Sequence, residues 1–297
     1  MLNSLLYFVL AIVTVSSQSF GMDNVAVTSK DISRLTADIA ESVIHVANEA
    51  ISNHNRFFLG LAGGSMAKLL QDLSTCNIKT DFEKWYIIFV DERYVPLDSP
   101  DCNYLSFVSL LGKLKISQDN VLKLDYDEQG GVEIAAERYG TSFSNLVPDN
   151  SLDLLLLGMG PDGHIASLFP YFTSAGLHVP PPEAADTEQT CRPPYISIDA
   201  SPKPPPNRIT MTLETINKSK KIYFAITGGA KADTIAQFLT DFEVKEVPGV
   251  ETKDTEDIVG LCRYVKDTTL PASLIDISAT NLRFYLDKDA FASIKYR

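Results

Sequence analysis

The stretch LDLLLLGMGPDGHIASLFP at residues 152–170 contains the strongest structural signal in the chain. A run of leucines leads straight into three glycines, an aspartate and a histidine. A run that is apolar at nearly every residue predicts a strand buried on both faces, as in a parallel sheet covered by helices. The glycines that follow predict a tight turn at the carboxyl end of that strand. We therefore expect a buried strand over 152–157 that delivers polar residues to its end.

Three other segments repeat this order. Residues 57–61, 86–90 and 222–226 are also short apolar runs followed by glycine or charged residues. Helical periodicity covers 28–54, where Thr28 or Ser29 is a candidate N-cap, and 130–146. Strands alternating with helices predict an α/β fold, doubly wound and Rossmann-like, with a mainly parallel sheet and helices on both faces in three layers.

The remaining segments are less regular. Residues 178–206 are rich in proline and lack periodicity, which predicts a loop or extended segment. Residues 240–258 carry several charges and predict a surface excursion. The tail at 282–294 predicts a last strand and a short helix. We expect residues 22–297 to form a single α/β domain.

The N-terminus allows two interpretations. LLYFVLAIVTV at residues 5–15 has the length of a signal-peptide core, but no Lys or Arg precedes it. It is shorter than the about 20 apolar residues that span a bilayer, so we expect no stable membrane anchor. Residues 1–21 are either a signal segment, which implies the ER lumen or secretion, or an extension to a cytoplasmic chain that begins at Met22.

Charge and cysteine content exclude some classes of function. The net charge of −12 argues against a nucleic-acid partner, because binding to phosphate backbones needs a basic surface. The four cysteines are far apart and have no zinc-site spacing, so no metal site is predicted. A small anionic ligand remains possible if a few cations are concentrated locally. The sequence does not determine the oligomeric state, and a monomer is consistent with it.

Polar or glycine-rich segments follow all four predicted strands. Ligands of open α/β sheets bind outside the carboxyl ends of the strands, so these segments are expected to meet. Bare backbone there would admit an anion, and nearby cations would bind it. Each candidate also has a plain structural interpretation: a tight turn, an ion pair with a neighbouring carboxylate, or a solvated surface cation. The candidates are Gly63, Gly64, Ser65, Arg93, Arg208 and Lys231.

His164 is the candidate for proton transfer. It lies on a strand-end turn two residues after Asp162, which could orient the imidazole ring. The glycines at 158, 160 and 163 also spell G-x-G-x-x-G, but Pro170 follows within two turns and no second strand ends in an acid at the required distance. A dinucleotide site is therefore rejected, and the absence of G-x-S-x-G argues against a serine hydrolase.

These motifs resemble the family that contains the 6-phosphogluconolactonases and the glucosamine-6-phosphate deaminases. The matching pieces include LGLAGGSM, VDERYVPLDSPDCNY, GMGPDGHIASLFP, SPKPPPNRIT and TGGAKADTI, in family order. The resemblance implies hydrolysis of 6-phospho-D-glucono-1,5-lactone, the second step of the oxidative pentose phosphate pathway, without metal or organic cofactor.

The resemblance also implies roles for individual residues. His164 matches the proposed general base, and Asp91 matches a catalytic carboxylate of the deaminases. The phosphate-binding positions match residues 63–65, Arg93 and Lys231, and less firmly Arg208. Two alternatives stay open: a glucosamine-6-phosphate isomerase or deaminase, and a non-catalytic protein that binds sugar phosphates.

Overall fold

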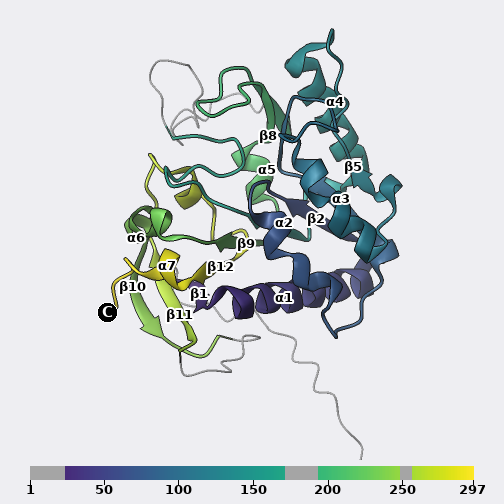
Figure 1. Ribbon diagram of the computed structural model, residues 1–297. Coiled ribbons are helices and arrows are strands. Elements are labelled where there is room, and N and C mark those ends of the chain that lie inside the picture. Colours follow the sequence, from purple (N-terminus) through teal and green to yellow (C-terminus); the bar gives the residue numbers. More distant parts are fainter. Residues whose placement is uncertain (1–23, 171–192, 248–255) are drawn as a thin grey trace, which may run out of the picture.

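The computed structural model describes residues 24–170, 193–247 and 256–297. Within these residues a nine-stranded sheet forms the centre of the molecule (Figure 1). Its strands are β1 (Asn24–Lys30), β2 (Phe57–Leu61), β3 (Trp85–Phe89), β5 (Val121–Leu122), β6 (Leu154–Leu157), β9 (Lys221–Ile226), β10 (Leu239–Val244), β11 (Ile258–Tyr264) and β12 (Asn281–Asp287). Their spatial order is β10-β11-β1-β12-β9-β6-β2-β3-β5.

The sheet is mainly parallel, as predicted. Every neighbouring pair from β1 through β12, β9, β6, β2 and β3 to β5 is parallel. Only the β1–β11 and β11–β10 pairs, at one edge of the sheet, are antiparallel. The four predicted apolar strands are the neighbours β9, β6, β2 and β3, so their carboxyl ends lie on one side of the sheet, called here the carboxyl rim.

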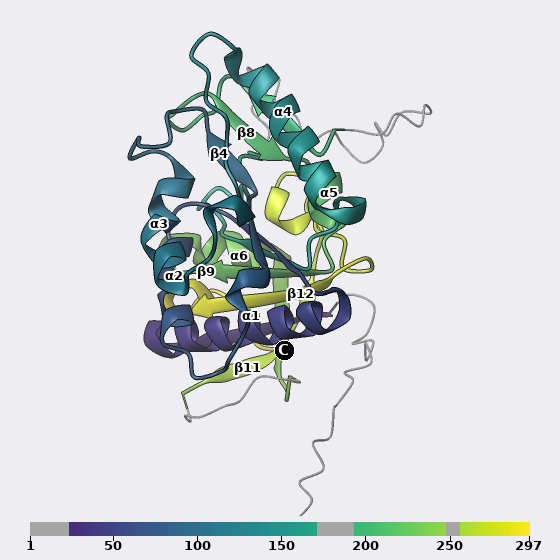
Figure 2. The same ribbon diagram turned by 90° about the vertical axis from the view of Figure 1, so that its right-hand side faces the viewer.

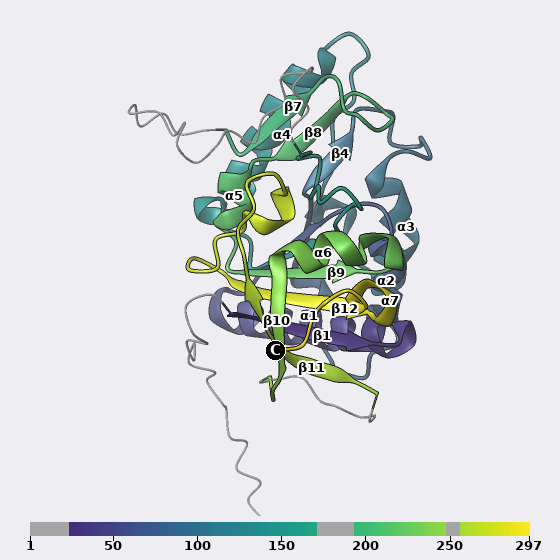
Figure 3. The same cartoon turned by 90° about the vertical axis from the view of Figure 1, so that its left-hand side faces the viewer.

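Helices cover both faces of the sheet (Figure 2). One face packs against α1 (Ile32–His54), α2 (Met66–Leu69) and α3 (Asn103–Leu114). The other packs against α4 (Gly131–Leu146), α5 (Leu213–Asn217), α6 (Ala232–Phe238) and α7 (Lys288–Phe291), and Figure 3 shows α6 and α7 beside β9 and β12.

Alternate side chains of each central strand enter opposite cores. Leu154 and Leu156 of β6 pack with α1 and α3, whereas Leu155 and Leu157 pack with α4 and α6. All four are fully buried. This two-sided burial explains why the strand is apolar at every position, and it confirms the doubly wound, three-layer prediction.

A second sheet was not predicted. It consists of β4 (Asp91–Arg93), β8 (Arg208–Met211) and β7 (Tyr195–Ile198), paired antiparallel in the order β4-β8-β7. Strand β7 lies inside 178–206, where a loop or extended segment was predicted: residues 195–198 are extended and residues 199–206 form a loop, whereas residues 171–192 lie outside the described residues. Figures 1 and 2 show β8 beside α4.

Two other boundaries differ from the sequence predictions. The helix expected at 28–54 begins only at Ile32, because residues 24–30 form β1; Asp31, not Thr28 or Ser29, is its N-cap residue. The excursion expected at 240–258 begins as the edge strand β10, and its residues 248–255 lie outside the described residues. The tail does form a strand and a short helix, β12 and α7.

The described residues contain no helix that is both long enough and apolar enough to cross a bilayer. The N-terminal segment 1–21, on which the signal-peptide interpretation depends, lies outside them.

Candidate active site

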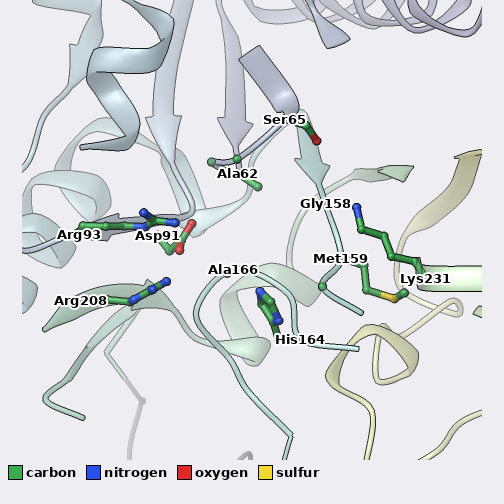
Figure 4. Close-up of a pocket in the computed structure, with 13 residues that line it drawn as sticks. Ala62, Ser65, Asp91, Arg93, Gly158, Met159, His164, Ala166, Arg208 and Lys231 are labelled. Carbon is green, nitrogen blue, oxygen red and sulfur yellow. The ribbon is translucent and has the colours of Figure 1, made fainter. Parts of the chain in front are cut away.

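A cavity of about 250 Å³ opens at the carboxyl rim (Figure 4). Eight of the nine predicted site residues line it, and the ninth, Asp162, contacts the ring of His164. They come from the segments that follow β2, β3, β6 and β9, together with the first residue of β8. The predicted residues in the cavity wall are Gly63, Gly64, Ser65, Asp91, Arg93, His164, Arg208 and Lys231.

The turn after β6 places the His164 ring in the cavity. Gly163 has a φ of +80°, a left-handed conformation that favours glycine. Gly160 allows close contact, because a Cβ there would lie 2.0 Å from His164 Cε1. Figure 4 shows the ring between Arg208 and Lys231. Two glycines of the quoted stretch therefore serve the placement of one imidazole.

Asp162 and Lys203 hold one side of the ring. Asp162 Oδ1 lies 2.5 Å from His164 Nδ1, and Lys203 Nζ lies 3.1 Å from both Asp162 Oδ2 and His164 Nδ1. The short Asp162 contact assigns a proton to Nδ1, which donates to the carboxylate. Nε2, the other ring nitrogen, makes no hydrogen bond with the residues that the structure describes and is then the acceptor available to the cavity that His164 lines.

Electrostatics favour the neutral imidazole. Burial lowers the pKa of His164 below its ordinary value; Asp162 opposes this shift, and the charge of Lys203 adds to it. Burial alone would raise the pKa of Asp162, but its bonds to His164 and Lys203 outweigh that effect and lower the pKa. The result is an ionised carboxylate beside a neutral base at neutral pH.

The turn at 63–65 presents unused donors to the cavity. The backbone N–H groups of Gly63, Gly64 and Ser65 donate to no acceptor among the described residues. Ser65 makes no side-chain cap, so its hydroxyl is also unused there. Gly64 has a φ of +68°, and a Cβ on it would meet nothing within 4 Å. Only four residues of α-helix follow, fewer than the helical pattern predicted.

Arg93 and Arg208 lie opposite each other across the β4–β8 pair. The Arg208 side chain is buried, and its Nε and NH2 donate to the carbonyls of Lys203, Pro204 and Pro205 at 2.9 Å. The solvated surface arginine is thus the wrong interpretation for this residue. Burial and the nearby charge of Arg93 lower the pKa of Arg208.

Arg93 is not held by its carboxylate neighbours. Its NH1 donates to the carbonyl of Asp101 at 3.2 Å, and its buried Nε has no partner among the described residues. The Glu92 carboxylate instead accepts from the backbone N–H groups of Arg93, Asn103 and Tyr104 at 2.7–2.9 Å. Two adjacent guanidiniums, one with an unused buried donor, form a site for an anion.

Asp91 is buried and engaged. Its Oδ2 accepts from Ser167 Oγ at 2.7 Å, and Arg208 NH1 donates to the same hydroxyl at 3.2 Å. Asn103 Nδ2 donates to the Asp91 carbonyl at 2.9 Å. These bonds make Asp91 a counter-charge to Arg208 more than a free proton acceptor.

Lys231 supplies a third cation, from the residue that precedes α6. Its side chain makes no hydrogen bond or ion pair with the residues described. Burial lowers its pKa, opposed by the attraction of Asp287. Figure 4 shows it on the side of His164 opposite Arg208.

Sequence reasoning missed three residues of this site: Lys203, Ser167 and Asn103. Lys203 lies in the quoted SPKPPPNR segment. A cationic side chain placed between two prolines was the one feature of the sequence that could have marked it as a site residue. Ser167 and Asn103 act through contacts that cross the fold, for which the local sequence gives no signal. Among the described residues no cluster of three His, Cys, Asp or Glu side chains could hold a metal ion.

Comparison with known proteins adds independent findings. The family profile described as "Glucosamine-6-phosphate isomerases/6-phosphogluconolactonase" matches residues 30–259. A probable 6-phosphogluconolactonase of Drosophila melanogaster is 37% identical over 214 residues, covering 71% of this chain and 81% of that protein. The 6-phosphogluconolactonase of Rattus norvegicus is 36% identical over 218 residues, covering 70% and 79%.

A solved structure agrees with the fold. The 6-phosphogluconolactonase from Shewanella baltica superimposes with a TM-score of 0.63 at 25% identity, covering 89% of this chain and 97% of that one. The similarity therefore extends over most of both molecules.

Proposed function

The chain belongs to the family of glucosamine-6-phosphate isomerases and 6-phosphogluconolactonases, and from this premise we propose that it hydrolyses 6-phospho-D-glucono-1,5-lactone to 6-phospho-D-gluconate. One observation carries the proposal: the His164 imidazole, whose pKa is lowered by burial, lines a cavity together with three cationic side chains. The base suits attack of water on a lactone, and the cations suit a phosphate. In metabolism this reaction is the second step of the oxidative pentose phosphate pathway.

We propose His164 as the general base. Nε2 takes a proton from water as the water oxygen bonds to C1 of the lactone. The carbonyl oxygen gains negative charge, which a positively charged cavity stabilises. When the carbonyl re-forms, the bond from C1 to the ring oxygen breaks, and the imidazolium returns its proton to that oxygen. Asp162 holds Nδ1–H throughout, so the ring keeps its orientation and the cation is stabilised.

The phosphate positions the substrate. Arg93, Arg208, Lys231 and the free N–H groups of residues 63–65 are the proposed contacts. A substrate held at its phosphate has its C1 already oriented toward the base. The loss of orientational freedom then occurs on binding and does not add to the barrier of the reaction step. The local cations act against the overall negative charge of the molecule.

The contacts of Asp91 favour the lactonase over the deaminase. Proton transfer during deamination would need a carboxylate free to accept a proton, whereas Asp91 Oδ2 already accepts from Ser167 Oγ, the hydroxyl to which Arg208 NH1 donates. The substrate test supplies freshly generated 6-phosphogluconolactone or glucosamine 6-phosphate, with spontaneous lactone opening subtracted. We expect lactone hydrolysis well above that background; ammonia release without lactone hydrolysis would establish the deaminase, and binding without turnover would establish the non-catalytic alternative.

The phosphate anchors give a separate prediction. Arg93→Ala or Lys231→Ala should each lower kcat/KM for phosphogluconolactone by about 10- to 100-fold, because a charge-assisted hydrogen bond contributes about 1.5–3 kcal/mol. The rate with unphosphorylated gluconolactone should change much less. Steady-state kinetics with both lactones measures this. If a variant loses activity equally on both lactones, the loss does not come from the phosphate, and the substituted residue is not one of the phosphate anchors.

A further inference from the structure

Lys203 lies beside the catalytic pair but outside the cavity wall. Its Nζ is 3.1 Å from Asp162 Oδ2 and 3.1 Å from His164 Nδ1, the ring nitrogen that also contacts Asp162 Oδ1. The side chain is 41% exposed. Lys203 therefore touches the pair that we assign to proton transfer without contacting the space where the substrate binds.

The position of Lys203 does not depend on its own side chain. Arg208, itself buried, donates to the main-chain carbonyls of Lys203, Pro204 and Pro205 and so fixes the loop through its backbone. A change of the Lys203 side chain leaves all three bonds in place. The effect of its charge can therefore be tested without displacing the loop.

We propose that Lys203 is a positioning residue that shares the Asp162 carboxylate with His164 and thereby keeps the imidazole neutral, with Nε2 ready to accept a proton from water. The inference rests on the proposed function of His164. A carboxylate bonded to imidazole alone favours the imidazolium form, which cannot act as a base. A second cation on the same carboxylate reduces that preference, while the bond from Nδ1–H still orients the ring.

The other charges around His164 come from several elements. Asp91 of β4 attracts a proton to the ring, as Asp162 does. Arg93, Arg208 and Lys231 line the same cavity, and Arg208 also lies 5.7 Å from the centre of the Phe169 ring, which packs against His164. Lys203 is the cation in direct contact with Nδ1 and Asp162, so its removal isolates one contact in this field.

The chain contains a matched control at the amino ends of the strands. There His54 Nε2 lies 2.9 Å from Asp153 Oδ1, and Lys220 Nζ lies 2.7 Å from the same oxygen. Lys220 is 55% exposed, similar to Lys203. Lys220→Met thus removes a lysine from a second His–Asp pair that is remote from the cavity.

The experiment is an NMR titration of the imidazoles in wild type, Lys203→Met, Lys203→Gln, Lys203→Arg and Lys220→Met. The chain has four histidines, and a His164→Ala spectrum identifies the signal of His164. We expect the pKa of His164 to rise by about 0.5–1 unit in Lys203→Met and Lys203→Gln, because the direct contact with a positive charge is lost. Lys203→Arg keeps the positive charge, so the pKa of His164 should stay close to its wild-type value. Lys220→Met should leave the pKa of His164 unchanged.

The pH profile of lactone hydrolysis provides the second readout. The acid limb of kcat/KM in Lys203→Met should move to higher pH by the same amount, with a rate near that of wild type on the alkaline side. An unchanged pKa of His164 in folded Lys203→Met and Lys203→Gln would overturn the inference, as would an equal shift in Lys220→Met. The titration needs no turnover. If the pKa of His164 changes as expected in the Lys203 variants but the wild-type protein does not hydrolyse the lactone, only the proposed function is contradicted.

Discussion

Gly160 shows what the imidazole requires of its neighbours. A Cβ at this position would lie 2.0 Å from His164 Cε1, 2.1 Å from Nδ1 and 2.5 Å from Asp162 Oδ1. Since no real side chain tolerates such contacts, the ring and the carboxylate pack directly over bare backbone. The glycine is therefore needed for the space that it leaves, and not for an unusual backbone angle.

Gly160→Ala should move the imidazole and lower kcat by about 100-fold, because a displacement of about 1 Å costs that much in a well-oriented site. The affinity for 6-phosphogluconate should fall only a few-fold, since the phosphate contacts are elsewhere. Steady-state kinetics and product-binding calorimetry measure the two effects. Gly112→Ala in α3, where an added Cβ meets nothing within 4 Å, is the control. Full activity in Gly160→Ala would show that the ring position is not critical.

Glu92 joins two elements. It is 1% exposed, and its carboxylate accepts from N–H groups of its own strand, β4, and of the first turn of α3. Burial raises its pKa, opposed by these three N–H groups. A carboxylate at the first turn of a helix satisfies otherwise free donors and interacts favourably with the helix dipole. Glu92 therefore positions α3 and, through Asn103, the cavity wall at Asp91.

Glu92→Ala should lower the free energy of unfolding by about 2–4 kcal/mol, because buried N–H groups lose a charged acceptor. Urea unfolding measures this, and Glu137→Ala on the exposed side of α4 is the control, with an expected change within about 0.5 kcal/mol. A Glu92→Ala protein as stable as that control would show that the carboxylate has no role in holding the helix.

Elements were predictable where local pattern determines them. Strands β2, β3, β6 and β9 could be located because burial on both faces makes every residue apolar. β1 could not, because NVAVTSK mixes polar and apolar residues and continues into the periodicity of α1. β4 consists of three charged residues, Asp91–Arg93, and pairs only because β8 lies beside it.

In the whole molecule, the candidate active site and the buried contacts of Asp153 lie at opposite ends of the parallel strands. The cavity lies at the carboxyl rim, whereas Asp153 at the amino ends joins α1, β2 and Lys220 through His54, the Phe58 N–H group and the lysine. The shared rim of the predicted site residues followed from parallel strands. The contact of Lys203 with Asp162, and the insertion of β12 between β1 and β9, depend on long-range packing that no local pattern reports.

The most direct test of the account compares His164→Gln with His54→Gln, because each removes an imidazole bonded to an aspartate, at opposite ends of the sheet. Rates of phosphogluconolactone hydrolysis, corrected for spontaneous opening, are measured from pH 5 to 8. We expect His164→Gln to lose about 100- to 10,000-fold in kcat, the usual contribution of a general base, while binding of 6-phosphogluconate persists. His54→Gln should remain within about twofold of wild type, and the wild-type acid limb should lie below the ordinary histidine pKa of about 6.5, since burial lowers the pKa of His164. Undiminished hydrolysis by His164→Gln would contradict the account.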